Sequence, residues 1–201
     1  MNRMGRRAVA SAIGIGAVLP AAGCGVVGTA AAGDGAPVAM TVSSSAFTQA
    51  TMIPARYTCA AGTKAINPPL GWGGTPAGTK SLALVVDDSD APITPYVYWI
   101  VFDINPGTSE ILEGQLPPGA RQARNSEGTV GYDPLCPGPQ GHEYRFTVYA
   151  LNRVLNLPEG ASLQSAWSAI ASAAAITGGR GRLTASAATP ASAAAVTSAM
   201  P

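Results

Sequence analysis

Three short segments with the composition of buried β-strands constrain the fold of this chain more than any other feature. They cover residues 81–86, 96–102 and 144–151 and consist mainly of aliphatic, β-branched and aromatic residues, which favour strands. The connections at residues 54–80 and 111–141 are long and dense in proline and glycine. Loops of that length are uncommon in compact domains unless they carry a site. We therefore expect a β-rich domain with functional loops.

Two weaker strand candidates and one helix complete the predicted pattern. The weaker strands are at residues 41–45 and 182–185. Apolar residues recur at helical spacing over residues 163–174; Ser162 is suited to cap this helix, and Gly178-Gly179 is suited to end it. The sequence thus predicts a mainly β fold, a sandwich of antiparallel strands with a late α-helix.

The N-terminus has the features of an export signal. Three arginines precede an apolar stretch, residues 8–19, that is too short for a permanent membrane span. Small residues at positions 21–23 then stand directly before Cys24, which resembles the bacterial lipobox, although such boxes usually have leucine where Ala21 stands. Residues 1–23 are therefore predicted to be a lipoprotein-type signal peptide, with Cys24 as the lipidated residue. The alternatives are an ordinary cleaved signal or an uncleaved anchor.

The rest of the chain divides by composition into three parts. Residues 24–39 are predicted to be a flexible tether, residues 40–185 the folded domain, and residues 186–201 a low-complexity tail of mostly alanine, serine, threonine and proline. Removal of residues 1–23 leaves nine basic and eleven acidic residues, a balance of −2. A chain without a basic surplus is a poor partner for nucleic acid.

The cysteines agree with export. When Cys24 is assigned to lipid, Cys59 and Cys136 remain as one pair, and an oxidising compartment permits a bridge between them. We expect a disulfide between Cys59 and Cys136; the alternative is two independent buried thiols.

Two motifs about fifty residues apart contain the groups most suited to a binding site. Asp87, Asp88 and Asp90 follow the first strong strand, and His142 and Tyr144 begin the third. Because side chains alternate along a strand, the imidazole and the phenol share a face. Together with backbone N–H groups of the preceding glycine-rich loop, they can surround an oxyanion. An aspartate there could orient the imidazole or contact a cation; the alternative role of these aspartates is turn formation.

At these motifs the sequence resembles the phosphatidylethanolamine-binding protein family, in particular its bacterial Raf-kinase-inhibitor-like branch. The similarity covers about residues 42–185, with the motifs in the family's order. The matching segments are Ser45-Ala46-Phe47, residues 53–59, residues 67–72, residues 76–84, Asp88-Ser89-Asp90-Ala91-Pro92, Cys136-Pro137, residues 141–146 and Tyr149-Ala150-Leu151.

The resemblance implies two antiparallel sheets and a small pocket for phosphate, acetate or a phospholipid head group. Carried over by position, the pocket residues are Asp88, Asp90, Pro92, Tyr98, Gly141, His142 and Tyr144. Tyr98 stands where the family usually has histidine, which replaces a group that titrates near neutral pH by a neutral phenol. Glu143 stands where the family often has arginine. By strand alternation, Tyr98 and Trp99 are expected on opposite faces.

These observations predict a non-enzymatic binding protein for a phospholipid head group or another small anionic or phosphorylated ligand. A lipid on Cys24 would hold it at the outer face of the cell membrane or envelope; secretion without a lipid is the alternative. The main alternative function is a protease inhibitor or other protein-interaction module, which rests on family precedent alone and identifies no protein partner.

An enzyme and a metal site are less favoured. Ser89 or Ser126 could be combined with His142 and Asp88 as a hydrolase, but the sequence has no Gly-x-Ser-x-Gly motif. The clustered aspartates lack the spacing of a calcium loop, and a single histidine leaves zinc short of ligands. The sequence therefore predicts neither a metal nor a cofactor.

Overall fold

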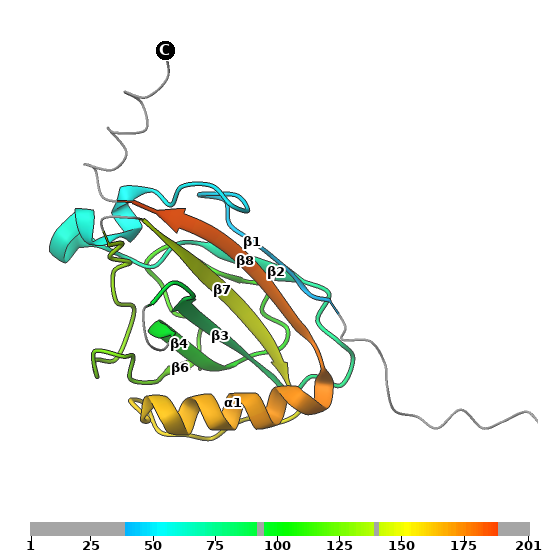
Figure 1. The fold of residues 1–201 in the computed structure, drawn as a ribbon. Helices are drawn as coiled ribbons and strands as arrows, with labels where there is room; N and C mark the ends of the chain where they lie inside the picture. The colour runs from blue at the N-terminus through cyan, green and yellow to red at the C-terminus, as the bar shows by residue number, and fades with distance from the viewer. Residues whose placement is uncertain (1–38, 92–94, 139–140, 189–201) are drawn as a thin grey trace, which may run out of the picture. The chain divides into compact units, whose positions relative to one another are not determined.

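The computed structural model describes residues 39–91, 95–138 and 141–188. Within these ranges the chain forms two antiparallel β-sheets, short 3-10 helices and an α-helix (Figure 1), which confirms the predicted fold class. The elements are β1 (Thr41–Ser43), η1 (Ala55–Tyr57), η2 (Cys59–Lys64), β2 (Leu70–Gly73), β3 (Ser81–Asp88), β4 (Tyr96–Ile104), β5 (Glu110–Ile111), β6 (Arg121–Gln122), β7 (His142–Leu151), α1 (Leu163–Thr177) and β8 (Arg180–Ala187).

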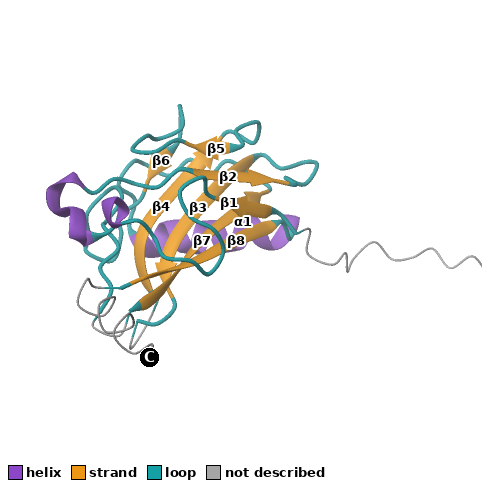
Figure 2. Cartoon of the chain, turned by 90° about the horizontal axis from the view of Figure 1, so that it is seen from above, coloured by secondary structure: helices purple, strands orange, loops and turns teal. Residues whose placement is uncertain are grey.

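The larger sheet has the strand order β6-β4-β3-β7-β8, and the smaller sheet has the order β1-β2-β5. Figure 2 shows helix α1 on the side of the larger sheet away from β1, β2 and β5. Strand β3 lies at the centre of the larger sheet, and all eight of its residues are buried. A strand covered on both faces needs apolar side chains at successive positions, which explains the continuous apolar run in its sequence.

The two faces of β3 contribute to two separate hydrophobic clusters. Leu82, Leu84 and Val86 pack in the cluster between the sheets, whereas Ala83 and Val85 pack with α1. The alternation continues at the end of the strand, so the adjacent residues Asp87 and Asp88 point to opposite sides of the sheet.

Helix α1 begins and ends where the sequence predicts. The Ser162 hydroxyl accepts a hydrogen bond from the Ser165 N–H, and Gly178 adopts the left-handed conformation at the C-terminal cap. Ala166, Ile170 and Ala173 are its buried residues. In the described part of the chain, no helix is long and apolar enough to cross a membrane.

A β-bulge corrects the predicted orientation of Tyr98 and Trp99. Val86 pairs with Trp99, but the next residue, Asp87, pairs with Val97. One extra residue in β4 is therefore accommodated at Tyr98, and regular alternation is interrupted there. As a result, Tyr98 and Trp99 both belong to the cluster between the sheets; the prediction that they lie on opposite faces is wrong.

Candidate ligand-binding site

The centre of the candidate site is an aspartate–histidine pair at one end of the larger sheet. Asp88 ends β3, and His142 begins the neighbouring strand β7. The Nδ1 atom of His142 lies 2.6 Å from Oδ2 of Asp88, and the Asp88 side chain is only 2% exposed. The two motifs that stand apart in the sequence are thus in direct contact. The second imidazole nitrogen, Nε2, remains for another partner, since one aspartate occupies Nδ1.

Asp90 fixes the backbone around this pair. Its N–H donates to the other oxygen of Asp88, Oδ1, at 2.7 Å. Its own side-chain oxygen accepts from the Glu143 N–H at 2.8 Å. Asp90 therefore connects the end of β3 to the start of β7, the turn role considered as its alternative in the sequence.

The glycine-rich loop approaches the imidazole from the other side. A Cβ atom on Gly138 would lie 3.0 Å from Nε2 of His142, so only glycine leaves that nitrogen unobstructed. Gly141 has φ +75°, a left-handed conformation that glycine adopts readily, and its N–H donates to the Gly138 carbonyl at 3.0 Å. Pro92, another predicted pocket residue, lies outside the described residues.

Two tyrosines form the apolar wall of the site. The rings of Tyr98 and Tyr144 meet edge to face with centroids 5.4 Å apart. Burial raises the pKa of Tyr98 to about 12, and burial together with Tyr98 also raises the pKa of Tyr144. Both phenols are therefore neutral donors across the physiological range. The Tyr144 hydroxyl is buried, with no partner at hydrogen-bond distance among the described residues, and the phenol of Tyr98 is the polar group beside it.

An acidic cavity of about 310 Å³ adjoins Tyr98. Its lining includes Tyr96, Glu127 and Asp133. The Tyr96 hydroxyl lies 2.7 Å from an oxygen of Glu127 and 3.0 Å from an oxygen of Asp133, so one phenol contacts two carboxylates. Burial raises the pKa of Asp133, which the hydrogen bond from Tyr96 opposes. Sequence reasoning missed this group because its members lie in a long loop without a recognisable motif.

The structure does not contain the predicted disulfide: Cys59 and Cys136 are both free thiols. Their backbones are adjacent, since the Cys59 N–H donates to the Leu135 carbonyl at 3.2 Å. Cys136 is an exposed residue, and partial burial of its sulfur and then the neighbouring Cys59 raise its pKa to about 12.

Asp87 belongs to the opposite face of the sheet. Its carboxylate forms an ion pair with Arg145, in which the arginine Nε lies 3.2 Å from Oδ1. The three clustered aspartates therefore do not share one pocket. Within the described ranges, no group of three or more His, Cys, Asp or Glu residues is arranged to hold a metal ion.

The two serines considered for a hydrolase are bonded elsewhere. The Ser89 hydroxyl lies 3.4 Å from the Glu143 carbonyl. The Ser126 hydroxyl accepts from the Val97 N–H at 2.9 Å. A nucleophile needs a direct hydrogen bond to its base, and neither hydroxyl makes such a bond to His142 in the described part of the structure.

Comparisons with known proteins agree with the architecture and with the motifs. The family model described as "Phosphatidylethanolamine-binding protein" matches residues 43–179. A "UPF0098 protein" of Methanothermobacter thermautotrophicus is 43% identical over 128 residues, which cover 61% of this chain and 83% of that protein. The "Putative lipoprotein LppC" of Mycobacterium tuberculosis is 44% identical over 137 residues, 67% of each chain.

Solved structures show the same fold. A Chlamydia trachomatis protein called "Putative PhosphatidylEthanolamine-Binding Protein (PEBP) Homolog CT736" superposes with a TM-score of 0.65 at 32% identity, covering 74% of this chain and 97% of that one. Escherichia coli YbcL superposes with a TM-score of 0.67 over 75% of this chain and 98% of its own. Its identity is 24%, so that likeness concerns the fold alone.

Proposed function

The chain belongs to the phosphatidylethanolamine-binding protein family, and from this premise we propose that it binds the phosphorylated head group of a lipid, or a small molecule of the same chemistry, without transforming it. The observation that carries the proposal is the contact of 2.6 Å between His142 and the buried Asp88. A buried carboxylate on Nδ1 orients the ring and leaves Nε2 available for a hydrogen bond with a phosphate group.

The neighbouring groups suit the same ligand. The unpaired Tyr144 hydroxyl offers a second donor, and the phenol of Tyr98 lies beside it. Phosphate oxygens accept such hydrogen bonds strongly because they are charged. An isolated phosphate would also meet the charge of Asp88, whereas a zwitterion places a cation near the acids. Glu127 and Asp133 form no ion pair within the described residues, so their cavity suits an ammonium group.

We also propose that the protein is exported and attached to the membrane through Cys24. The signal-like residues 1–23 and the similarity to a protein named a lipoprotein support this location. Residues 24–39 would then act as a tether that holds the site near lipid head groups. Metabolic labelling with a fatty-acid analogue tests the anchor: label should be found in the native protein and be lost in Cys24→Ser. Equal labelling of both would refute attachment at this cysteine.

Calorimetric titration with O-phosphoethanolamine tests the binding proposal. We expect His142→Ala and Asp88→Asn each to weaken binding by about tenfold or more, since a hydrogen bond to a charged group contributes about 1.5–3 kcal/mol. Glu143→Gln is the matched control: its carboxylate lies on the exposed side of the same strand, and only its backbone N–H contacts the site residue Asp90. Equal affinity in all four proteins would exclude this site.

A test for catalysis accompanies the titration. Incubation of the native protein with phosphoethanolamine and with p-nitrophenyl acetate should release neither phosphate nor nitrophenol above the buffer rate. Turnover that disappears in His142→Ala would replace the binding proposal by an enzymatic one.

A further inference from the structure

A row of three cavities follows one flank of helix α1, on the sheet face opposite the Asp88–His142 pair. The first has a volume of about 440 Å³ and lies near the start of the helix, between Val97, Leu163 and Trp167. The second, of about 50 Å³, shares Trp167 with it. The third, of about 290 Å³, lies at the helix end and shares Tyr149 and Ala171 with the second. Because adjoining cavities have lining residues in common, they follow one another along the helix, and we refer to the three together as the groove.

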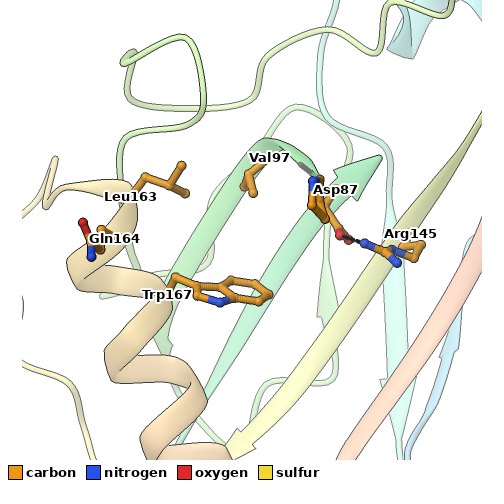
Figure 3. Close-up of a pocket in the computed structure, with 7 residues that line it drawn as sticks. Asp87, Val97, Arg145, Leu163, Gln164 and Trp167 are labelled. Atoms are coloured by element: carbon orange, nitrogen blue, oxygen red, sulfur yellow. Dashed lines mark hydrogen bonds and ion pairs between the residues drawn. The ribbon is translucent and has the colours of Figure 1, made fainter. Parts of the chain in front are cut away.

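The lining of this groove is mostly apolar, and its exposed aromatic residue is unusual. Trp167 is 42% exposed, and Figure 3 shows its indole extending from α1 toward the strands that carry Asp87 and Arg145. Trp167, Ala171 and Ala175 lie on the groove flank, where small alanines leave room. Helix α1 itself contains no charged residue.

The charges that line the groove favour an anion. Asp87 and Arg145 neutralise each other at one end. Arg180 lines the other end and has no ion-pair partner among the described residues. The groove therefore offers one uncompensated positive charge beside an apolar channel.

The dimensions favour a linear molecule. The groove accompanies the 15 residues of α1, about 22 Å at a rise of about 1.5 Å per residue. A single acyl chain spans half of a bilayer's hydrocarbon core, about 15 Å, and therefore fits within this length. A second helix would need a wider channel than the narrow part of about 50 Å³ beside Trp167.

From the linear arrangement of the three cavities, their apolar lining and the single free arginine, we infer that the groove binds the alkyl chain of a single-chain anionic amphiphile such as a long-chain carboxylate, with the anionic group near Arg180. This site is separate from the head-group site, and it does not depend on the proposed function.

Titration of the full chain with sodium dodecanoate, below its micelle concentration, tests the inference. Tryptophan fluorescence is the readout, because Trp72 and Trp99 are only 7% and 2% exposed and the signal should come from Trp167. We expect saturable binding that tightens about tenfold for each two methylenes added from octanoate to dodecanoate. A response that is linear up to the micelle concentration would overturn the inference.

Matched variants locate the ligand. Ala171→Phe fills the groove and should weaken dodecanoate binding at least tenfold. Ser172→Phe is the control, because it adds a phenyl ring at an exposed helix position that lines none of the three cavities. This control variant should bind dodecanoate like the native protein. Arg180→Gln should weaken dodecanoate binding by about fivefold and leave dodecanol binding unchanged. Equal affinities of Ala171→Phe and Ser172→Phe would refute the groove. Equal affinities of the native protein for dodecanoate and dodecylamine would refute the preference for an anion.

Competition separates this site from the head-group site. Saturating O-phosphoethanolamine should leave dodecanoate affinity unchanged, and Ala171→Phe should bind O-phosphoethanolamine like the native protein. Displacement of dodecanoate by O-phosphoethanolamine would place the carboxylate at His142 and overturn the inference, while the head-group proposal would stand.

Discussion

Replacement of Tyr144 by phenylalanine is expected to stabilise the free protein and to weaken ligand binding. The Tyr144 ring is completely buried, and its hydroxyl has no partner within the described structure. A buried unpaired polar group costs about 1–3 kcal/mol. Phenylalanine removes that oxygen but keeps the edge-to-face contact with the ring of Tyr98. The free energy of unfolding should therefore rise by about 1–2 kcal/mol.

Calorimetry and thermal denaturation measure the two effects on the same protein. For a domain of this size, about 1 kcal/mol raises the Tm by roughly 2–4 °C. Binding of O-phosphoethanolamine should weaken by about tenfold or more, because the ligand loses one hydrogen bond to a charged oxygen.

Tyr132→Phe is the matched control for this prediction. The Tyr132 hydroxyl donates to the Tyr57 carbonyl at 2.7 Å, so the same substitution there removes a formed hydrogen bond and should lower the free energy of unfolding by about 1 kcal/mol. If Tyr144→Phe destabilises the protein as much as Tyr132→Phe does, the Tyr144 hydroxyl is already hydrogen-bonded in the free protein and the reasoning fails.

Three further predictions concern the surrounding structure. Arg145→Ala leaves the carboxylate of Asp87 buried without its cation and should lower the free energy of unfolding by about 3 kcal/mol. Asp87→Ala leaves an arginine that can extend into solvent and should lower the free energy of unfolding by only about 1 kcal/mol. Equal losses of the two variants in urea denaturation would contradict this reasoning. Alkylation of Cys136 by iodoacetamide, followed by peptide mapping, should be about 1000-fold slower at pH 8 than alkylation of a free cysteine. The alkylation rate should increase up to about pH 12, the raised pKa of Cys136, and a plateau below pH 10 would disprove that raised pKa. Gly181→Ala places a Cβ atom 2.5 Å from the Met40 carbonyl oxygen and should lower the free energy of unfolding by more than about 2 kcal/mol, so a urea midpoint equal to that of the native protein would be inconsistent with this packing.

The parts of the fold that the sequence predicted are those with strong local signals. Strands β3, β4 and β7 are long and apolar, and helix α1 has both an N-cap serine and a terminal glycine. The short strands β2, β5 and β6 were missed. Strands β5 and β6 each contain two residues, which is too few for a periodic pattern. These short strands form because the neighbouring strands offer backbone partners, and their own residues carry little strand preference.

The candidate site shows the same division. The contact between Asp88 and His142 follows from two motifs at adjacent strand ends, and strand alternation separates Asp87 from Asp88, but neither signal identifies the partners of the other acids. Asp87 lies one residue before Asp88 and joins Arg145 on the other side of the sheet. Glu127 and Asp133 come near Tyr96 through a loop whose course depends on tertiary contacts. Sequence spacing alone could identify neither arrangement.

The bulge at Tyr98 gives the candidate site its chemical character. Without the extra residue in β4, regular alternation would not place both Tyr98 and Trp99 on the face that carries Asp88. With it, the phenol replaces the imidazole usual in this family at a position in contact with Tyr144, and burial keeps that phenol protonated by raising its pKa to about 12. Tyr98 therefore offers the ligand a neutral hydrogen-bond donor in place of a group that could carry a positive charge.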